Sequence, residues 1–369
     1  GSTLMITADC GITGVKEVAL ANELGLDVIV TDHHQVGEEG LPNAVAVLNP
    51  HRDECNYPFR FLSGVGLAFK LAIAIRSKLH SAGRKKENLP NLKRHLDLFA
   101  LGTIADVAPL TGENHILTRH GLDVLTTSAK PGLVALKEVA GIAGNVDARS
   151  VGFGLGPRLN AAGRLEDMST GIECLLTNSE NEAYLLALQL DSINQDRKQI
   201  ELDMREQAFQ SLEHLVIETD NLPAALCLFD ERWHQGVVGI VASRIKDKFN
   251  RPAIAFAQVD AADSEEVELK GSARSIQGFH IRDALDAVAT QNPGLITKFG
   301  GHAMAAGLSL AKDNFDSFSR AFNSHAKKLL NPNGKILIDS STLFEGNINK
   351  ILLEKIKFMI KETKKKNNK

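Results

Sequence analysis

The sequence predicts an α/β protein built from two α/β domains that are joined by a long helix. Three observations support this fold class. Two short apolar runs flank a helix-length segment within residues 4–32, and residues 179–215 contain neither glycine nor proline. A second series of strand-like and helix-like segments then follows between residues 224 and 330. Strands that alternate with helices are typical of parallel sheets covered by helices.

The composition agrees with two soluble domains. The chain has 369 residues, of which 43% are hydrophobic, and its formal net charge is −3, so an anionic partner would need a local basic patch. The four cysteines form no C-x-x-C pair, which favours reduced thiols over disulfides or a structural zinc site. No apolar run approaches the roughly 20 residues that span a bilayer, and no signal peptide is visible. We therefore expect a cytoplasmic protein without a membrane partner.

In the first domain, "LMITADCG" (4–11) predicts a buried strand, residues 14–25 a helix, and "DVIVTD" (27–32) the next strand. A further strand is expected within 44–50 and an apolar helix over 63–79. Residues 92–110 should start as a helix and break at Gly102, which would deliver Asp106 to a loop ahead of Pro109.

Acids and imidazoles gather at these predicted strand ends. Asp9 follows one strand, and Asp32, His33 and His34 follow the next, at the edge where open α/β sheets bind ligands. Together with Asp106 they form a mixed oxygen and nitrogen set, which suits Mn²⁺ and less exclusively Mg²⁺. Each residue alone has a simpler interpretation, because Asp32 could cap a backbone amide and Asp106 could be an Asx-turn residue.

The long helix is predicted from apolar residues that recur every three or four positions between Leu186 and Leu215. At 1.5 Å per residue it would be roughly 55 Å long, which suits a strut between two domains. In the second domain, strands are expected near 224–230, 252–259 and 268–274, and helices near 235–249, 280–289 and 314–330. The basic C-terminal end of the chain predicts a solvated tail.

Two segments of the second domain predict phosphate binding. In "KGSARS" (270–275), Ser272 and Arg274 share one face of a strand, and "GGHAMAAG" places Gly300, Gly301 and His302 in a turn. An ordinary edge strand with solvated polar residues is the simpler alternative. His234 could equally cap the helix after it, and Trp233 is interpreted as a core residue.

Several motifs in order resemble the DHH phosphoesterase superfamily. "TADCGITG", "VIVTDHH" and "LGTIADVAPL" are similar to its motifs II, III and IV, and "GPRLNAAGRL" (156–165), "WHQGVVGIVASRI" (233–245), "KGSARS" and "KFGGHAMAAGL" (298–308) resemble the RecJ family within it. The resemblance covers about residues 4–328. It implies a DHH domain over 1–178 that lacks its N-terminal part, a connecting helix over 179–216, and a smaller DHH-associated domain over 217–330. Residues 331–369 would be a tail, in which "KILIDSSTL" could start an OB-fold. The active cleft would lie between the domains.

The resemblance also implies an activity and roles for individual residues. RecJ enzymes degrade single-stranded DNA from its 5′ end to nucleotide 5′-monophosphates in DNA repair and recombination, by two-metal hydrolysis with Mn²⁺ or Mg²⁺. Asp9, His33 and Asp106 would bind metal, His34 would lie against the substrate phosphate, and Asp32 would orient an imidazole. Contacts to DNA or its 5′ phosphate would come from the residues that match the remaining motifs, namely Arg158, Asn160, Arg164, Ser272, Arg274, Gly300, Gly301 and His302. A single-strand-binding protein and a RecQ-type helicase are the protein partners that the family implies.

One departure from the family pattern bears on activity. DHH enzymes carry a D-x-D-G motif upstream of the "DCG" aspartate, and no such stretch precedes Asp9 in this sequence. The expectation is at most one well-bound metal and weak or absent nuclease activity for this chain by itself. Two other functions stay open: a DHH phosphodiesterase acting on short oligonucleotides or cyclic dinucleotides, and a non-catalytic scaffold that binds single strands.

Overall fold

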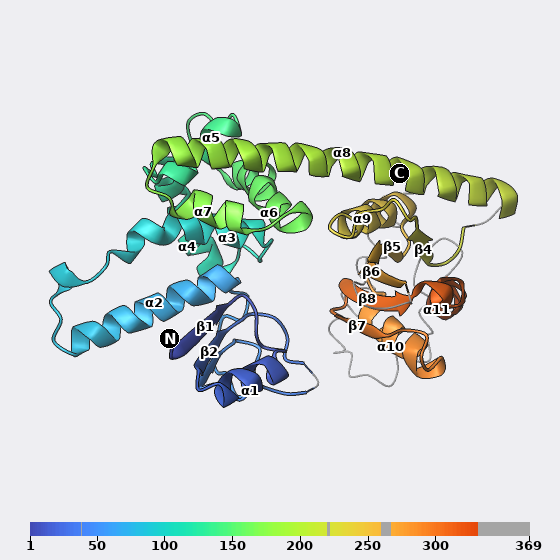
Figure 1. The fold of residues 1–369 in the computed structure, drawn as a ribbon, viewed down its shortest axis with the longest axis horizontal. Helices are drawn as coiled ribbons and strands as arrows, with labels where there is room; N and C mark the ends of the chain where they lie inside the picture. The colour runs from blue at the N-terminus through green and yellow to red at the C-terminus, as the bar shows by residue number, and fades with distance from the viewer. Residues whose placement is uncertain (38, 220–221, 260–266, 331–369) are drawn as a thin grey trace, which may run out of the picture. The chain divides into compact units, whose positions relative to one another are not determined.

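The computed structural model describes residues 1–37, 39–219, 222–259 and 267–330 (Figure 1), and the side chains of 214–219 are outside this description. The chain divides into two compact units, Gly1–Lys198 and Gln199–Lys369. The expected tail and its "KILIDSSTL" segment lie outside the described residues. Among the described residues, no helix is both long and apolar enough to cross a membrane.

The first unit contains a parallel sheet of β1 (Leu4–Ala8), β2 (Asp27–Thr31) and β3 (Ala46–Leu48), in that order. Helix α1 (Val15–Glu23) connects β1 to β2, and Val18 packs with Val28 and Val30 in a small core. The predicted βαβ step is confirmed. The prediction of a buried first strand is wrong, because β1 lies at the sheet edge and its Leu4 and Ile6 are 48% and 51% exposed.

Helices make up the rest of this unit. They are α2 (Gly64–Ser81), α3 (Leu96–Ala105), α4 (Gly112–Thr126), α5 (Pro131–Val139), the π-helix η3 (Ser150–Leu155), α6 (Gly156–Leu165) and α7 (Ser169–Leu176), with short 3₁₀ turns at Lys86–Asn88 and Leu92–His95. The predicted break at Gly102 is wrong, since α3 runs through it to Ala105. A Cβ on Gly102 would lie 2.8 Å from Cγ1 of Val65, so this glycine lets α2 and α3 approach closely rather than ending the helix. The segment "GPRLNAAGRL", which carries Arg158 and Arg164, forms α6.

Helix α8 spans Glu180–Thr219, over the stretch where the sequence predicts a long helix. Its buried apolar residues follow the predicted spacing and include Leu190, Ile193, Met204, Ala208 and Leu212. Ala183, Ala187 and Leu190 belong to the core of the first unit. The side chain of Leu215 is not among those described.

The second unit contains a mixed sheet with the strand order β4-β5-β6-β8-β7. Its strands are β4 (Leu226–Phe229), β5 (Ala253–Val259), β6 (Glu268–Arg274), β7 (Lys298–Gly301) and β8 (Ala305–Ala311), and only β4 and β5 pair in parallel. The helices are α9 (Val238–Phe249), α10 (Ile281–Gln291), a 3₁₀ turn at Lys312–Asn314, and α11 (Phe315–Leu329). Trp233 is 5% exposed, as its interpretation as a core residue predicts. The turn prediction for Gly300 and Gly301 is wrong, because both belong to β7.

Candidate metal centre and phosphate-binding groups

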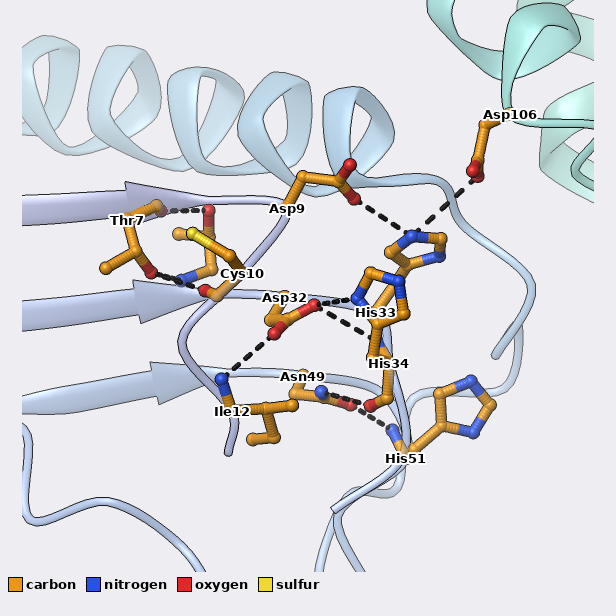
Figure 2. Close-up of polar contacts among 11 residues, drawn as sticks. Thr7, Asp9, Cys10, Ile12, Asp32, His33, His34, Asn49, His51 and Asp106 are labelled. Atoms are coloured by element: carbon orange, nitrogen blue, oxygen red, sulfur yellow. Dashed lines mark hydrogen bonds and ion pairs between the residues drawn. The ribbon is translucent and has the colours of Figure 1, made fainter. Parts of the chain in front are cut away.

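The candidate metal centre begins at the carboxyl ends of the parallel strands in the first unit (Figure 2). Ala8 pairs with Thr31, so Asp9 and Asp32 directly follow neighbouring strands. The Asp9 amide donates to the carbonyl of Thr31 and the Asp32 amide to the carbonyl of Leu48, both at 3.0 Å. The sheet ladder therefore fixes both acidic residues one position beyond the strand ends.

Asp9 is held in an unusual backbone conformation with room made for its side chain. Its φ is +66°, in the left-handed region that aspartate tolerates better than most residues. Gly64 is the first residue of α2, and a Cβ on it would lie 2.2 Å from Oδ1 of Asp9. Only glycine therefore leaves enough space for the Asp9 carboxylate. Sequence reasoning missed Gly64, and the only signal was a glycine at the start of an apolar helix.

His33 lies between two carboxylates. Its Nε2 is 2.9 Å from Oδ1 of Asp9 and 3.7 Å from Oδ2 of Asp106, and its side chain is 17% exposed. The Asp9 carboxylate raises the pKa of His33, against the effect of burial, and the charge of Asp106 acts in the same direction as Asp9. A cation, whether a proton or a metal ion, is therefore favoured at this nitrogen.

Asp106 reaches the site from the C-terminal end of α3. It is the C-cap residue of that helix and lies in the turn ahead of Pro109, where the sequence predicts a loop. Burial raises the pKa of its carboxyl group, and the nearby His33 opposes that effect. A hydrogen bond of 3.0 Å between the hydroxyls of Ser63 and Thr103 joins the start of α2 to α3, so the elements that carry Gly64 and Asp106 are tied together.

His34 is oriented by the buried Asp32. Nδ1 of His34 lies 2.7 Å from Oδ1 of Asp32, which also accepts from the His34 amide, while Oδ2 accepts from the Ile12 amide at 2.9 Å. Burial opposes ionisation of Asp32, but these amides and the His34 ring together lower its pKa. An ionised Asp32 only accepts hydrogen bonds, so Nδ1 of His34 carries the proton. The other ring nitrogen, Nε2, is left to act on a ligand.

A residue that follows the third strand holds the backbone of His34 in place. Asn49, one residue after β3, is 4% exposed and donates from Nδ2 to the carbonyl of His34 at 2.8 Å. Its Oδ1 accepts from the amide of His51 at 2.7 Å. Sequence reasoning did not select Asn49, although a buried amide at the end of a third parallel strand was the available signal.

The donor set fits a divalent metal ion. Asp9, His33 and His34 each offer a ligand atom, and these atoms all lie within 4.8 Å of one another. Nε2 of His33 is buried and lies 2.9 Å from Oδ1 of Asp9, so one ion could be bound by both atoms. Carboxylate and imidazole donors without thiolate suit Mn²⁺ and Mg²⁺. Asp106, which the sequence predicts as a ligand, is not among these three residues, and its Oδ2 lies 3.7 Å from Nε2 of His33.

In the second unit, Ser272 and Arg274 lie together beside the N-terminus of a helix. Nη1 of Arg274 donates to Oγ of Ser272 at 2.9 Å, which places both side chains on one face of β6. A Cβ on Gly239, in the first turn of α9, would lie 2.8 Å from Nη2 of Arg274 and 3.0 Å from Oγ of Ser272. Gly239, which sequence reasoning missed, therefore lets a guanidinium and a hydroxyl approach the positive end of α9, a combination suited to an anion.

The other predicted residues of this unit lie at the same end of the sheet. Arg274 pairs with Ala305, and Gly301 pairs with Ala306 on the other side of β8. Gly301 has a φ of +143°, and a Cβ there would lie 2.5 Å from the carbonyl of Ala305, so only glycine fits. His302 is exposed in the turn after β7. His234 accepts a hydrogen bond from the Gly236 amide through Nδ1 at 3.1 Å, but α9 begins at Val238 with Val237 as its N-cap and without a side-chain cap, so the prediction that His234 caps this helix is wrong.

The three predicted residues of α6 have different surroundings. Arg158 is 9% exposed, pairs with Asp191 at 2.8 Å and donates to the carbonyl of Gly154. Asn160 and Arg164 are exposed and lie four residues apart on one helix face. Within the first unit, Asn160 and Arg164 are therefore more accessible to a ligand than Arg158.

Comparison with known proteins agrees with this arrangement. Residues 2–103 match the model of the DHH family, N-terminal domain, and residues 221–328 match the DHHA1 domain. The chain is 48% identical over 347 residues to the single-stranded-DNA-specific exonuclease RecJ of Escherichia coli strain K12, covering 92% of this chain and 59% of that protein. It is 38% identical over 331 residues to RecJ of Bacillus subtilis strain 168, covering 89% of this chain and 39% of that protein.

Solved structures of similar fold carry the same name. RecJ of Thermus thermophilus in complex with Mn²⁺ matches with a TM-score of 0.74 and 34% identity, over 90% of this chain and 46% of that one. A structure of exonuclease RecJ bound to manganese matches with a TM-score of 0.71 and 33% identity, over 91% of this chain and 78% of that one. Thus the chain spans little more than half of the Escherichia coli protein, yet both domain models match and Asp9, His33 and Asp106 lie close together. On this evidence the chain belongs to the RecJ family of the DHH superfamily.

Proposed function

We propose that this chain is the core of a metal-dependent exonuclease that degrades single-stranded DNA from its 5′ end to nucleotide 5′-monophosphates. The observation that carries the proposal is the convergence of Asp9, His33 and Asp106, from three separate segments, beside the oriented ring of His34. This donor set suits a divalent ion, and relatives with the same domains are named as single-strand-specific exonucleases.

Asp9, His33 and Asp106 are the residues that would hold Mn²⁺ or Mg²⁺. The ion would supply charge stabilisation at the phosphoryl group and would lower the pKa of a bound water. His34 would contact the scissile phosphate through Nε2, and Asp32 would keep the opposite nitrogen protonated and the ring in place.

The second unit would bind the strand through phosphate. Ser272 and Arg274, beside the start of α9, would contact the 5′ phosphate or a neighbouring one, and Gly300, Gly301 and His302 lie at the same end of that sheet. Asn160 and Arg164 would add contacts from the first unit, with Arg158 supporting their helix through Asp191. Binding through phosphate gives little sequence preference.

The proposal also covers how many metal ions these 369 residues bind by themselves and how active they are. Three ligand side chains make one well-bound ion the expected stoichiometry, and the activity of the chain alone is expected to be weak. Joining the chain to the D-x-D-G segment of a relative should raise both. Normal turnover by the chain alone would refute this part of the proposal and leave the rest intact.

The decisive experiment is digestion of a 5′-labelled single strand and the matching duplex with Mn²⁺, by the chain alone and by the chain joined to that segment. Release of labelled mononucleotide from the single strand only is expected. Activity restricted to very short oligonucleotides or cyclic dinucleotides would favour the alternative phosphodiesterase. Tight binding without cleavage by either protein would favour a non-catalytic scaffold.

The biological setting follows from that substrate. A role in DNA repair and recombination in the cytoplasm is proposed, with a single-strand-binding protein and a RecQ-type helicase as candidate partners. Co-purification of either protein with the chain would test the partners directly.

A further inference from the structure

Two large apolar side chains stand out by their exposure next to the candidate metal centre. Val107 is 85% exposed and Phe153 is 81% exposed, the two highest values among the large hydrophobic residues that the structure describes. Val107 directly follows Asp106, the C-cap residue of α3, and Phe153 lies in η3, a segment that packs against the last turn of α3. Such side chains cost free energy in water unless something covers them, so their position at a ligand site is informative.

Val107 occupies a position where glycine is the usual residue. The amide of Val107 donates to the carbonyl of Ile104 at 3.0 Å, and the amide of Ala108 donates to the carbonyl of Thr103 at 3.1 Å. These two hydrogen bonds form a Schellman motif, which ends α3 after its C-cap residue Asp106. The motif requires a left-handed backbone at the next residue, and Val107 has a φ of +58°. A β-branched residue is strained there, and strain of this kind concentrates at functional sites.

Phe153 is presented by an equally unusual segment. It lies in the π-helix η3, a conformation that is rare and frequent at functional sites. A Cβ on Gly156, the residue that follows η3, would lie 3.3 Å from Cβ of Ala105, and one on Gly152 would lie 3.8 Å from Cγ2 of Ile104. Gly152 and Gly156 therefore let the segment that carries Phe153 pack against the last turn of α3, the helix whose C-cap is Asp106, while Phe153 itself stays exposed.

We infer that Val107 and Phe153 form a platform for a nucleobase of the strand whose phosphate lies at the metal centre. The inference rests on the proposed function and names a further contact of the same site. A phenyl ring stacks on any base, because every base has a flat π-face, so such a platform adds affinity without sequence preference. A base in a duplex is already stacked on both sides, so the platform also favours single strands.

The neighbouring polar groups fit a nucleic acid better than an apolar protein segment. Gly156 begins the helix face on which the exposed Asn160 and Arg164 follow, so a hydrogen-bonding amide and a cation continue from the platform along α6. A strand that places a base on Phe153 would meet groups suited to its phosphates on the next turns of the helix.

The first test measures binding by the full chain to a short 5′-phosphorylated single strand, with Ca²⁺ in place of Mn²⁺ so that the strand is not consumed. An abasic site is moved through the positions nearest the 5′ end. For the unmodified chain, one position should weaken binding by about tenfold when its base is missing. Phe153→Ala should bind the complete strand about tenfold more weakly and show no further loss at that position, whereas Phe153→Trp should retain binding.

Leu176→Ala is the matched control, because Leu176 is 71% exposed on α7 and has no place in the proposed platform. It should leave strand binding and the abasic-site profile unchanged. If Phe153→Ala loses as much affinity from the abasic site as the unmodified chain does, the platform is refuted while the proposed function stands. If the unmodified chain binds no single strand at all, the proposed function fails and the platform fails with it.

Val107→Gly gives an independent test with effects in opposite directions. Glycine removes the strain of the left-handed position, so the midpoint of thermal unfolding should rise. The apolar side chain is lost, so single-strand affinity should fall by about threefold, a smaller loss than for an aromatic ring. A variant that is more stable and binds just as well would show that Val107 has no part in the platform.

Discussion

The candidate sites of the two units favour ligands of opposite charge. The first brings carboxylates and imidazoles together at strand ends, as in the pair of Asp9 and His33 at 2.9 Å, so its charges need a cation between them. The second brings the guanidinium of Arg274 and the hydroxyl of Ser272 to the first turn of α9, so its donors need an anion. Under the proposed function, a divalent ion would bind to the first site and a phosphate of the substrate to the second. In each site a glycine without a predicted role, Gly64 or Gly239, leaves the space that the functional side chain occupies.

The largest expected effect comes from removing a carboxylate from the first site. Asp9→Asn should lower Mn²⁺ affinity by at least about a hundredfold, because Asp9 supplies a ligand oxygen and the negative charge nearest His33. Calorimetric titration with Mn²⁺ measures this directly. Asp27→Asn, an exposed carboxylate at the opposite end of β2, is the control and should bind as the unmodified chain does. Equal loss in both variants would mean that general negative charge, and not the strand-end site, attracts the ion.

The second prediction concerns the space beside Asp9. Gly64→Ala should lower Mn²⁺ affinity by about ten- to a hundredfold, because the new Cβ would displace the carboxylate from its position near His33. Gly66→Ala in the same helix turn is the matched control, since its Cβ would come no closer than 3.3 Å to any neighbour, the flexible Cδ2 of Leu62. The same titration applies to both variants. Unchanged affinity in Gly64→Ala would show that Asp9 can relocate without cost.

The third prediction tests the anion site without touching the metal site. Gly239→Ala should weaken binding of a 5′-phosphorylated single strand by about three- to tenfold relative to a 5′-hydroxyl strand, because its Cβ would push the Arg274 guanidinium away from the start of α9. Competition binding with the two strands measures the ratio, and Mn²⁺ affinity should not change. Asp247→Ala, an exposed position near the end of α9, controls for effects on the helix itself. A loss of equal size for both strands would place the 5′ phosphate elsewhere.

The smallest expected effect concerns an acid that lies outside both sites. Glu113 pairs with Lys70 and accepts from the hydroxyl of Tyr57 at 2.5 Å. Burial opposes ionisation of Glu113, but Lys70 and Tyr57 together hold its pKa below the ordinary value of a glutamate. Because the pKa of Glu113 is lower in the folded chain than in the unfolded chain, ionised Glu113 stabilises the fold at a pH above its unfolded-state pKa. This contribution is lost as the pH falls through the folded-state pKa.

Because Glu113 and Lys70 are each one-third exposed, the contribution should be about 1 kcal/mol or less. Urea unfolding of the unmodified chain and Glu113→Gln should therefore differ at about pH 7 and converge below about pH 4. A difference that persists in acid would assign the effect to packing instead of charge. Metal affinity at neutral pH should be the same in both proteins, which separates this acid from those of the metal centre.

Local patterns in the sequence predicted much of the fold. The runs 27–32 and 268–274 predicted β2 and β6 almost residue for residue, because a β-branched run and an alternating run are the two local patterns typical of strands. The continuous pattern from Leu186 onward predicted α8 in the same way. Gly102 misled the helix prediction, since a glycine that breaks a helix and one that lets two helices touch look alike in sequence.

The sequence by itself also determined which residues gather at the first site. Parallel strands share one edge, so Asp9, Asp32, His33 and His34 had to meet there once their strands were recognised. Only the tertiary structure decided how they are held. The space beside Gly64, the support of His34 by Asn49, the Schellman turn that aims Asp106 and the contact of Gly239 with Arg274 all depend on segments that pack together. Most of these join residues far apart in the chain, and a pattern read along one segment carries no information about the surface that another segment will present to it.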